Sequence, residues 1–210
     1  MADGAVKKPS RIQLRNRKKI MTAALEVFSQ HGYRGATLDQ IAEAAGMSKP
    51  NLIYYFDGKE AIHVAVLNAL MDEWLAPLAE MDPDGDPLQE ILGYIRRKME
   101  MSRKYPRESR LFANEILQGA PRMAPHLKST LKPLFEEKCA LIEGWAAEGR
   151  LAQTDARQLV LSIWAITQHY ADFEAQIRVL IPDESGGWAD ANAHVEQLFR
   201  KLLTPAETSD

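Results

Sequence analysis

The sequence TLDQIAEAAGMSKPNLIYYFDGKE, residues 37–60, predicts two short helices joined by a tight turn, followed by the start of a third helix. Thr37 has Gln40 three residues later, which is the spacing of a capping box. An apolar stripe at helical period follows this cap: Leu38, Ile41, Ala42 and Ala45. Gly46 comes directly after the stripe, where a helix end favours a residue that tolerates left-handed φ.

The second short helix carries an apolar inner face and a polar outer face. Ser48 is placed to cap it, and Pro50 falls in its first turn, where a missing N–H costs little. Leu52 and Phe56, spaced i and i+4, form the inner face. The outer face carries Lys49, Asn51, Tyr54 and Tyr55. A short helix, a glycine turn and a polar-faced second helix indicate a helix-turn-helix, whose outer face suits phosphates and base edges.

An ordinary helical protein can also contain two short helices joined by a glycine turn, so the charge distribution matters. Residues 1–59 hold ten Lys and Arg against five Asp and Glu, a formal charge of +5. The whole chain carries −3, so the remainder carries −8. A basic end on an acidic body is typical of a protein that docks one end on a polyanion. This asymmetry favours DNA binding over a merely solvated basic tail.

Composition indicates a folded chain in a reducing compartment. The 210 residues are 46% apolar, enough for one large or two small domains with a buried core. The single Cys139 excludes an intramolecular disulfide and is most simply a small residue in a helix. No apolar run approaches the ~18–20 residues that span a membrane, and the N-terminus lacks the apolar region of a secretory signal. We therefore expect a cytoplasmic protein without a membrane segment.

Periodicity predicts an all-α fold, because no segment has the pattern of a strand. Besides the two short helices, we expect helices over Arg11–His31, Lys59–Met81, Leu88–Lys104, Pro106–Leu117, Pro125–Gly149, Asp155–Ile181 and Trp188–Leu203. Loops are expected at residues 82–87 and 182–188. The predicted organisation is an N-terminal three-helix helix-turn-helix domain, residues 11–58, and a larger helical effector-binding and dimerisation domain, residues 59–204.

Motifs for catalysis are missing from the sequence. Glu60 and His63 form one Glu-x-x-His, but di-iron bundles need two such pairs with further Glu ligands. No GxSxG, P-loop or GxGxxG occurs. We therefore expect neither an enzyme, nor a metal site, nor a cofactor.

The segment IWAITQHYADF, residues 163–173, is a candidate ligand-binding face. It places Trp164, Gln168 and Asp172 on one side of a helix. An aromatic ring beside an amide and a carboxylate fits a small planar ligand, through stacking and paired hydrogen bonds. Alternatively, Trp164 and Phe173 belong to the core, while Gln168 and Asp172 make helix–helix hydrogen bonds at a subunit contact. The residues alone leave both interpretations open.

SKPNLIYYFDGKEAI resembles the recognition helix and following helix start of TetR-type repressors, and IMTAALEVFSQHGYRGATLDQIAEAAG is similar to that family's N-terminal domain. The family often has Tyr where this chain has Ile53. The resemblance implies a homodimer, held by the last two long helices, on a roughly palindromic operator. It implies phosphate contacts from Thr37, Tyr55 and Lys59. The full expected DNA-binding set is Thr37, Ser48, Lys49, Asn51, Tyr54, Tyr55 and Lys59, with Lys49, Asn51 and Tyr54 nearer the bases.

Three segments resemble the pyrimidine-utilisation repressors within this family: WLAPL at 74–78, RLFANEILQGAP at 110–121 and IWAITQHYADF at 163–173. Residues 82–87 and the tail after Arg178 match poorly. The resemblance implies a repressor released by a pyrimidine base, either uracil or thymine. The implied ligand-binding residues are Trp74, Phe112, Asn114, Trp164 and Gln168. Alternatives are a TetR-type regulator with a different small planar or apolar effector, an effector-free DNA-binding protein, and a helical enzyme.

Overall fold

The computed structural model describes residues 10–182 and 187–205, and this part of the chain consists of helices joined by turns and loops, without strands. It divides into two compact units between Ala69 and Leu70. Helix α4, Gly58–Ala79, contributes residues to both units. Within the described ranges, no helix combines the length and apolar character needed to cross a bilayer.

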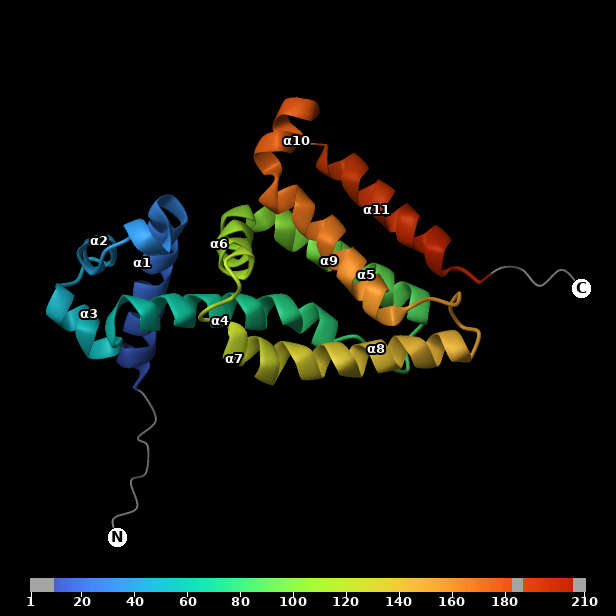
Figure 1. Cartoon of the computed structure of the whole chain (residues 1–210), viewed down its shortest axis with the longest axis horizontal. Coiled ribbons are helices and arrows are strands. Elements are labelled where there is room, and N and C mark those ends of the chain that lie inside the picture. The colour runs from blue at the N-terminus through green and yellow to red at the C-terminus, as the bar shows by residue number, and fades with distance from the viewer. Residues whose placement is uncertain (1–9, 183–186, 206–210) are drawn as a thin grey trace, which may run out of the picture. The chain divides into compact units, whose positions relative to one another are not determined.

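The first unit contains α1 (Arg11–Gly35), α2 (Leu38–Ala44), α3 (Lys49–Tyr55) and the beginning of α4 (Figure 1). Helix α1 was expected to end at His31, but it extends to Gly35 with a break at Gly32, whose φ is +65°. Glycine adopts this φ without a steric penalty, so the chain bends there and still closes another turn. The core of this unit includes Ile20, Ala24, Phe28, Ile41 and Leu52.

The predicted caps of the two short helices are confirmed. Thr37 Oγ1 accepts a hydrogen bond from Gln40 N at 3.2 Å, and Gln40 Oε1 accepts one from Thr37 N at 2.9 Å. Gly46 adopts φ +58° in the turn after α2. Ser48 Oγ then accepts from the N–H of Asn51 at 3.3 Å. Each cap satisfies an amide that the first helical turn leaves without a partner, so the helix-turn-helix is defined by local interactions.

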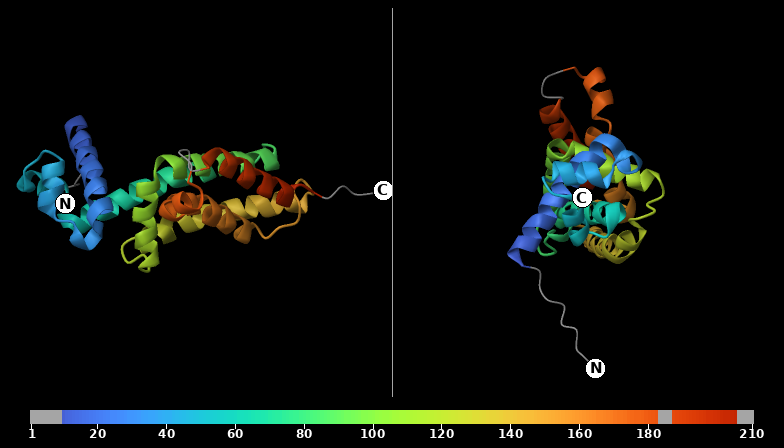
Figure 2. Two further views of the ribbon diagram at one scale, coloured as in Figure 1. Left: turned by 90° about the horizontal axis from the view of Figure 1, so that it is seen from above. Right: turned by 90° about the vertical axis from the view of Figure 1, so that its left-hand side faces the viewer.

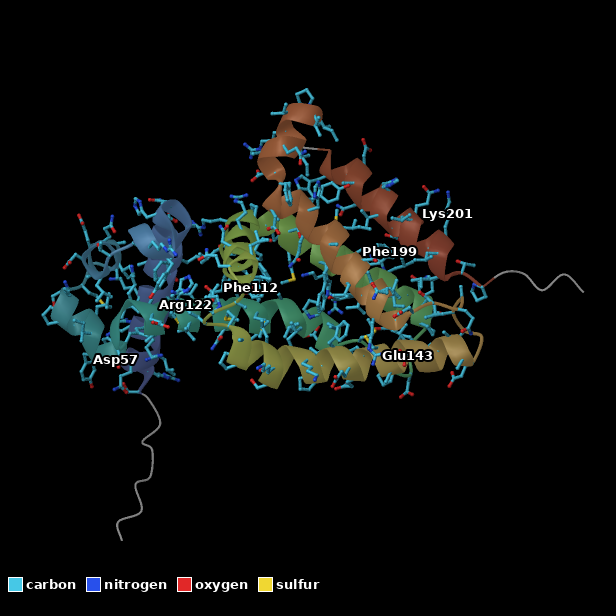
Figure 3. The ribbon with its side chains drawn as sticks, in the orientation of Figure 1. Asp57, Phe112, Arg122, Glu143, Phe199 and Lys201 are labelled. Atoms are coloured by element: carbon cyan, nitrogen blue, oxygen red, sulfur yellow. The ribbon has the colours of Figure 1, made fainter. Side chains whose placement is uncertain are left out.

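The second unit is a bundle around α5. Its remaining helices are α5 (Pro87–Lys104), α6 (Pro106–Leu117), α7 (Ala124–His126), the π-helical η1 (Leu127–Leu131), α8 (Lys132–Ala147), α9 (Ala156–Asp172), α10 (Glu174–Leu180) and α11 (Trp188–Leu203). Helices α9 and α11 both pack against α5, and α8 packs against α9 (Figures 1 and 2). One cluster of buried side chains joins these helices, including Ile95 of α5, Ile163 of α9 and Phe199 of α11. Phe199 is labelled in Figure 3.

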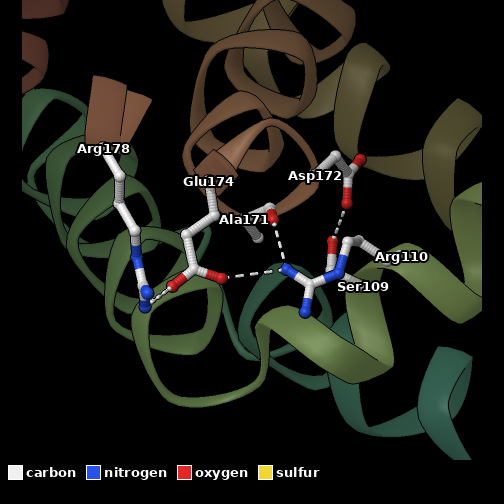
Figure 4. A network of polar contacts seen from close by, with 6 residues as sticks. All are labelled: Ser109, Arg110, Ala171, Asp172, Glu174 and Arg178. Carbon is white, nitrogen blue, oxygen red and sulfur yellow. Dashed lines mark hydrogen bonds and ion pairs between the residues drawn. The ribbon is translucent and has the colours of Figure 1, made fainter. Parts of the chain in front are cut away.

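In the second unit, two predicted helices differ from the observed ones. The expected helix Pro125–Gly149 contains the π-helical turn η1 before α8. The expected helix Asp155–Ile181 is broken at Phe173, where φ is −109° and ψ is 24°. Arg110 Nη1 of α6 donates to Ala171 O at 3.1 Å, so a distant side chain supplies a partner to a carbonyl beside the break (Figure 4). Of the loop expected at residues 182–188, residues 183–186 lie outside the described ranges.

Loss of the Thr37 cap should destabilise the first unit. We expect Thr37→Ala to lower the free energy of unfolding by about 1 kcal/mol, since the amide of Gln40 loses its side-chain acceptor. Thr22→Ala is the matched control: Thr22 is exposed within α1 and its hydroxyl bonds only to Lys18 O. Alanine favours a helix, so that change should be neutral or slightly stabilising. Urea unfolding of the full chain measures both, and equal effects of the two substitutions would contradict the capping role.

Candidate functional site

The outer face of α3 is open to solvent in the first unit. Lys49, Asn51 and Tyr54 are exposed, and Tyr54 retains 71% of its accessible surface. Lys49 Nζ lies 2.9 Å from Asp39 Oδ2 of α2, but both side chains are largely exposed. Exposed pairs of this kind contribute roughly 0–1 kcal/mol, so Lys49 can exchange the carboxylate for a nucleic-acid acceptor at little cost.

The end of α3 is fastened to α1. Asn16 Nδ2 donates to the Tyr55 hydroxyl at 2.7 Å, and Arg17 Nη1 donates to the Tyr55 carbonyl at 2.6 Å. The Arg17 guanidinium also lies 4.1 Å from the centroid of the Phe56 ring. These contacts fix the orientation of α3 within the unit and position the Tyr55 hydroxyl. Sequence analysis missed Asn16 and Arg17 because their partners lie about forty residues away.

Lys59 has a structural role besides the phosphate contact expected from the sequence. Its Nζ donates to Tyr33 O and to Ala36 O, each at 2.7 Å, and lies 4.7 Å from the centroid of the Tyr33 ring. Two of its three N–H donors are therefore used to join the end of α1 to the start of α4. Thr37 and Ser48, also expected at DNA, use their hydroxyls as helix caps.

Four of the five expected ligand-binding residues line one cavity of the second unit. It contains about 370 Å³ of space unfilled by protein atoms, part of it open to solvent. Its lining residues are Met71, Trp74, Leu75, Tyr94, Lys98, Phe112, Leu131, Trp164 and Gln168. Asn114 is exposed on α6 and does not line it. The enclosed part of the cavity is only about 50 Å³, below the range of about 300–1,000 Å³ that is usual for ligand pockets, so it suits only a small ligand.

Aromatic side chains form much of the cavity wall. Trp74 of α4 and Phe112 of α6 pack edge to face, with ring centroids 5.6 Å apart. Trp164 of α9 donates its indole N–H to the Tyr94 hydroxyl of α5 at 2.6 Å. Because the buried Tyr94 phenol loses hydration, its pKa is raised, and it remains neutral at physiological pH. The two tryptophans are thus held in place by neighbours before any ligand enters.

Two polar side chains of α9, Asp172 and the cavity residue Gln168, differ in whether the protein satisfies them. Asp172 accepts from the Ser109 hydroxyl at 2.6 Å, which is the helix–helix hydrogen bond that one sequence interpretation expected, though within one chain (Figure 4). Phe173 is exposed rather than part of the core. The Gln168 side-chain amide makes no hydrogen bond within the described part of the chain. It therefore retains both a donor and an acceptor for a ligand.

Lys98 is the charged residue among the cavity-lining residues that sequence analysis missed. It is only 5% exposed, and its Nζ lies 5.5 Å from the centroid of the Trp74 ring. Burial lowers the pKa of Lys98 to about 8, while the negative charge of Asp172 opposes that shift. A sequence signal existed: Lys98 falls three residues after Ile95 and seven after Ile91, on the inner face of an amphipathic helix.

Arg110 organises the wall between α6 and the α9–α10 break. Besides its bond to Ala171 O, its Nη1 lies 3.0 Å from Glu174 Oε2, and Glu174 also pairs with Arg178 (Figure 4). Burial raises the pKa of the Asp172 carboxyl, although the Ser109 hydrogen bond and the charges of Arg110, Lys98 and His169 act in the opposite direction. Ser109, the partner of Asp172 in this network, lines a second hollow together with Trp74, Lys98 and Gln168.

Removal of the buried charge should stabilise the protein. The lowered pKa of Lys98 means that the unfolded chain binds more protons between pH 8 and 10.5, so unfolding free energy rises with pH in that window. We expect Lys98→Met to raise the free energy of unfolding by up to about 3 kcal/mol at pH 7 and about 1 kcal/mol at pH 10. The raised pKa of Tyr94 acts above pH 10 in both proteins and cancels.

Urea unfolding at the two pH values measures this gain. Lys104→Met is the control, because Lys104 lies on the same helix, is exposed and pairs only with Glu100. A gain for Lys98→Met that is equal at pH 7 and pH 10 would show that lost charge burial is not its cause.

The two parts of the chain match two related family profiles. The profile described as "Bacterial regulatory proteins, tetR family" matches residues 20–66. The profile described as "YcdC-like protein, C-terminal region" matches residues 67–206, which contain all the cavity-lining residues.

Similar proteins and structures agree with these matches. The HTH-type transcriptional regulator RutR of Escherichia coli K12 is 51% identical over 183 residues, 86% of each chain. LmrA of Bacillus subtilis, also an HTH-type transcriptional regulator, is 29% identical over 66% of this chain and 72% of its own. Two solved structures share the fold at 18% identity. A tetR-family regulatory protein from Rhodococcus RHA1 has a TM-score of 0.75 and covers 95% of this chain and 100% of its own. The ketosteroid transcriptional regulator KstR2 of Mycobacterium tuberculosis has a TM-score of 0.70 and covers 97% of this chain and 100% of its own. The chain is thus a helix-turn-helix transcriptional regulator that belongs to the TetR family of bacterial regulatory proteins.

Proposed function

We propose that this regulator represses transcription as a homodimer on a palindromic operator and is released when a pyrimidine base, uracil or thymine, fills the cavity of the second unit. The main support for this proposal is the cavity, which is lined by Trp74, Trp164 and the Gln168 amide, a group without a hydrogen bond in the described chain. Trp74, Phe112, Trp164 and Gln168 all come from the three segments that resemble pyrimidine-utilisation repressors.

The chemistry of a pyrimidine base complements this cavity. The base is flat, so it can pack its faces against indole rings, and such contacts are favourable beyond simple area burial. Its edge carries adjacent N–H and carbonyl groups, which the donor and acceptor of the Gln168 amide can pair. The small volume favours a single ring over a nucleoside or a lipid.

Helix α3 supplies the DNA-reading face in this proposal. Lys49, Asn51 and Tyr54 are exposed and reach base edges in the major groove. Thr37, Tyr55 and Lys59 contact phosphates, with Ser48 at the start of the helix. Lys59 has one N–H donor left after its two carbonyl contacts, so it can hold the α1–α4 junction and a phosphate together.

Dimerisation uses the outer surface of α9 and α11. Leu159 and Ile163 of α9 and Val195 of α11 are buried in the core of the second unit, so they are not available to a partner subunit. The exposed leucines on these helices are Leu161, Leu198 and Leu202. Their side chains remain available to a second copy, as a TetR-type dimer requires.

Coupling follows from the continuity of α4. This helix carries Lys59 in its first turn and Trp74 further along the same element. A ligand that packs on Trp74 biases the position of a helix whose other end bears a DNA-binding residue. Such a helix can act as the two-state element through which ligand and operator affect each other.

Loss of the Gln168 amide should weaken base binding. We expect Gln168→Leu to reduce uracil affinity roughly 10–100-fold, because the polar edge of the buried base loses its partner at about 1–3 kcal/mol. Gln158→Leu, exposed on the same helix, is the matched control and should leave affinity unchanged. Calorimetric titration with uracil and thymine measures both variants. A wild type that binds neither base at millimolar concentration would exclude the pyrimidine assignment, and equal binding to free and operator-bound protein would exclude release.

Substitutions at base-contacting and phosphate-contacting residues should affect binding to the operator and to a scrambled duplex differently. Asn51→Ala should weaken binding to the operator and leave a scrambled duplex nearly unaffected, because base contacts carry sequence information. Tyr55→Phe should weaken both duplexes similarly, since the lost hydroxyl serves a phosphate. Affinities at two salt concentrations measure each effect. An Asn51→Ala variant that weakens both duplexes equally would contradict base reading by this residue.

A further inference from the structure

Lys98 differs from the other deeply placed lysines of the chain. Lys138 is equally buried, at 5% exposed, but its Nζ reaches Met81 O at 3.4 Å and Glu137 Oε1 at 3.1 Å. Lys59 donates to two backbone carbonyls. Lys98 Nζ forms neither a hydrogen bond nor an ion pair with any residue of the described chain, and its neighbour is the face of Trp74.

An ammonium in this position lacks an acceptor. Burial of a charge is strongly unfavourable unless the group is paired and hydrogen-bonded, and a ring face 5.5 Å away replaces only part of that interaction. Asp172 of α9 attracts Lys98 through space, but its carboxylate already accepts from Ser109 and forms no ion pair with the lysine. Tyr94, on the same helix, is a neutral phenol whose oxygen accepts from Trp164.

The ammonium is placed at the centre of the ligand-binding region. Lys98 lines the main cavity, and it also lines a small adjoining hollow with Met101, Ser102 and Ser109. Trp74 and Gln168 line both spaces as well. A ring packed on Trp74 would therefore meet a cationic donor and an amide, which are both without partners in the protein.

We propose that Lys98 anchors the effector by donating to an exocyclic oxygen of the bound ring, so that the pocket selects planar oxo-heterocycles and favours those that carry a negative charge. This inference rests on the proposed function, because both place the effector in the same cavity. It adds a charge preference that the aromatic walls and the neutral Gln168 amide do not provide. Charge-assisted hydrogen bonds are stronger than neutral ones, and a buried site strengthens them further.

Three ring probes separate the contributions. Pyrimidine has no exocyclic oxygen, uracil has two and is neutral at pH 7, and barbiturate has three and is an anion. The full-length wild type should bind barbiturate most tightly, then uracil, then pyrimidine. Lys98→Met should lose roughly 10–100-fold in uracil affinity, since a charged donor is removed, and more for barbiturate. Lys104→Met, an exposed lysine on the same helix, should preserve the wild-type order.

A second variant separates the charge from the hydrogen bond. Lys98→Gln keeps a donor without the charge, so it should retain more uracil affinity than Lys98→Met and lose the preference for barbiturate. The pH gives an independent readout in the wild type. Because the pKa of Lys98 is about 8, its protonated fraction falls about tenfold between pH 7 and pH 9, and barbiturate affinity should fall similarly. Burial raises the pKa of both titratable groups beside it: the pKa of Tyr94 moves away from this window, and that of the Asp172 carboxyl rises from an ordinary value far below it.

The outcomes distinguish the two proposals. Uracil binding that is equal in wild type and Lys98→Met overturns the Lys98 anchor and leaves the pyrimidine repressor intact. Barbiturate binding that depends on Lys98, without uracil binding, supports the anchor and excludes uracil as effector. If none of the three rings binds the wild type, both proposals fall. Circular dichroism and the urea midpoint of each variant show that affinity changes are measured on folded protein.

Discussion

The second unit depends on the enclosure of α5 by its neighbours. Leu92, Tyr94 and Ile95 are each at most 1% exposed, because α9 and α11 both pack against this helix. A helix buried over much of its surface must place its polar side chains among apolar ones, where each needs a partner. Tyr94 has one, since its hydroxyl accepts from the Trp164 indole at 2.6 Å. Lys98, one turn further along, has none within the described chain. The packing that forms the core therefore also leaves the Lys98 ammonium at the cavity without a partner among the described residues.

Lys98 and Lys138 are both buried in the second unit, but among the described residues only Lys138 is bonded by the protein itself. Lys138 joins α8 to Met81 and is satisfied by the protein itself. At Lys98 the fold tolerates the cost of burying an unpaired ammonium. An apolar side chain of similar length, such as methionine, would avoid that cost. Natural proteins tolerate such costs mainly where a site needs them, because a destabilised ground state is relieved when the ligand supplies the missing interaction. A ligand that pairs the ammonium would offset the free-energy cost of burying this charge, and that gain would add to its binding affinity.

The helix-turn-helix was predictable from the sequence because its determinants are local. Thr37, Gln40, Gly46 and Ser48 act within a few residues of themselves, and each occupies the backbone position that its side chain favours. The second unit was less predictable, since tertiary contacts override local periodicity there. The break at Phe173 depends on Arg110, more than sixty residues earlier, and both sides of it look helical in isolation. Most expected cavity residues were identified from the resemblance, but their exposure was not: Asn114 points away, and the inward position of Lys98 was hidden by its charged side chain.

Polar satisfaction also explains how one small cavity can discriminate among flat ligands. Almost any planar ring can stack on Trp74 and Trp164, so the aromatic walls contribute affinity but little specificity. Discrimination arises from groups that remain unpaired when the wrong ligand is bound, since the protein then keeps the cost of burying them. Gln168 and Lys98 are two such groups, and they come from helices α9 and α5, which pack directly against each other. A ligand that satisfies both bridges these helices, whereas one that satisfies neither gains only contact area. On the proposed function, binding of such a ligand would also strengthen the packing of α5 against α9.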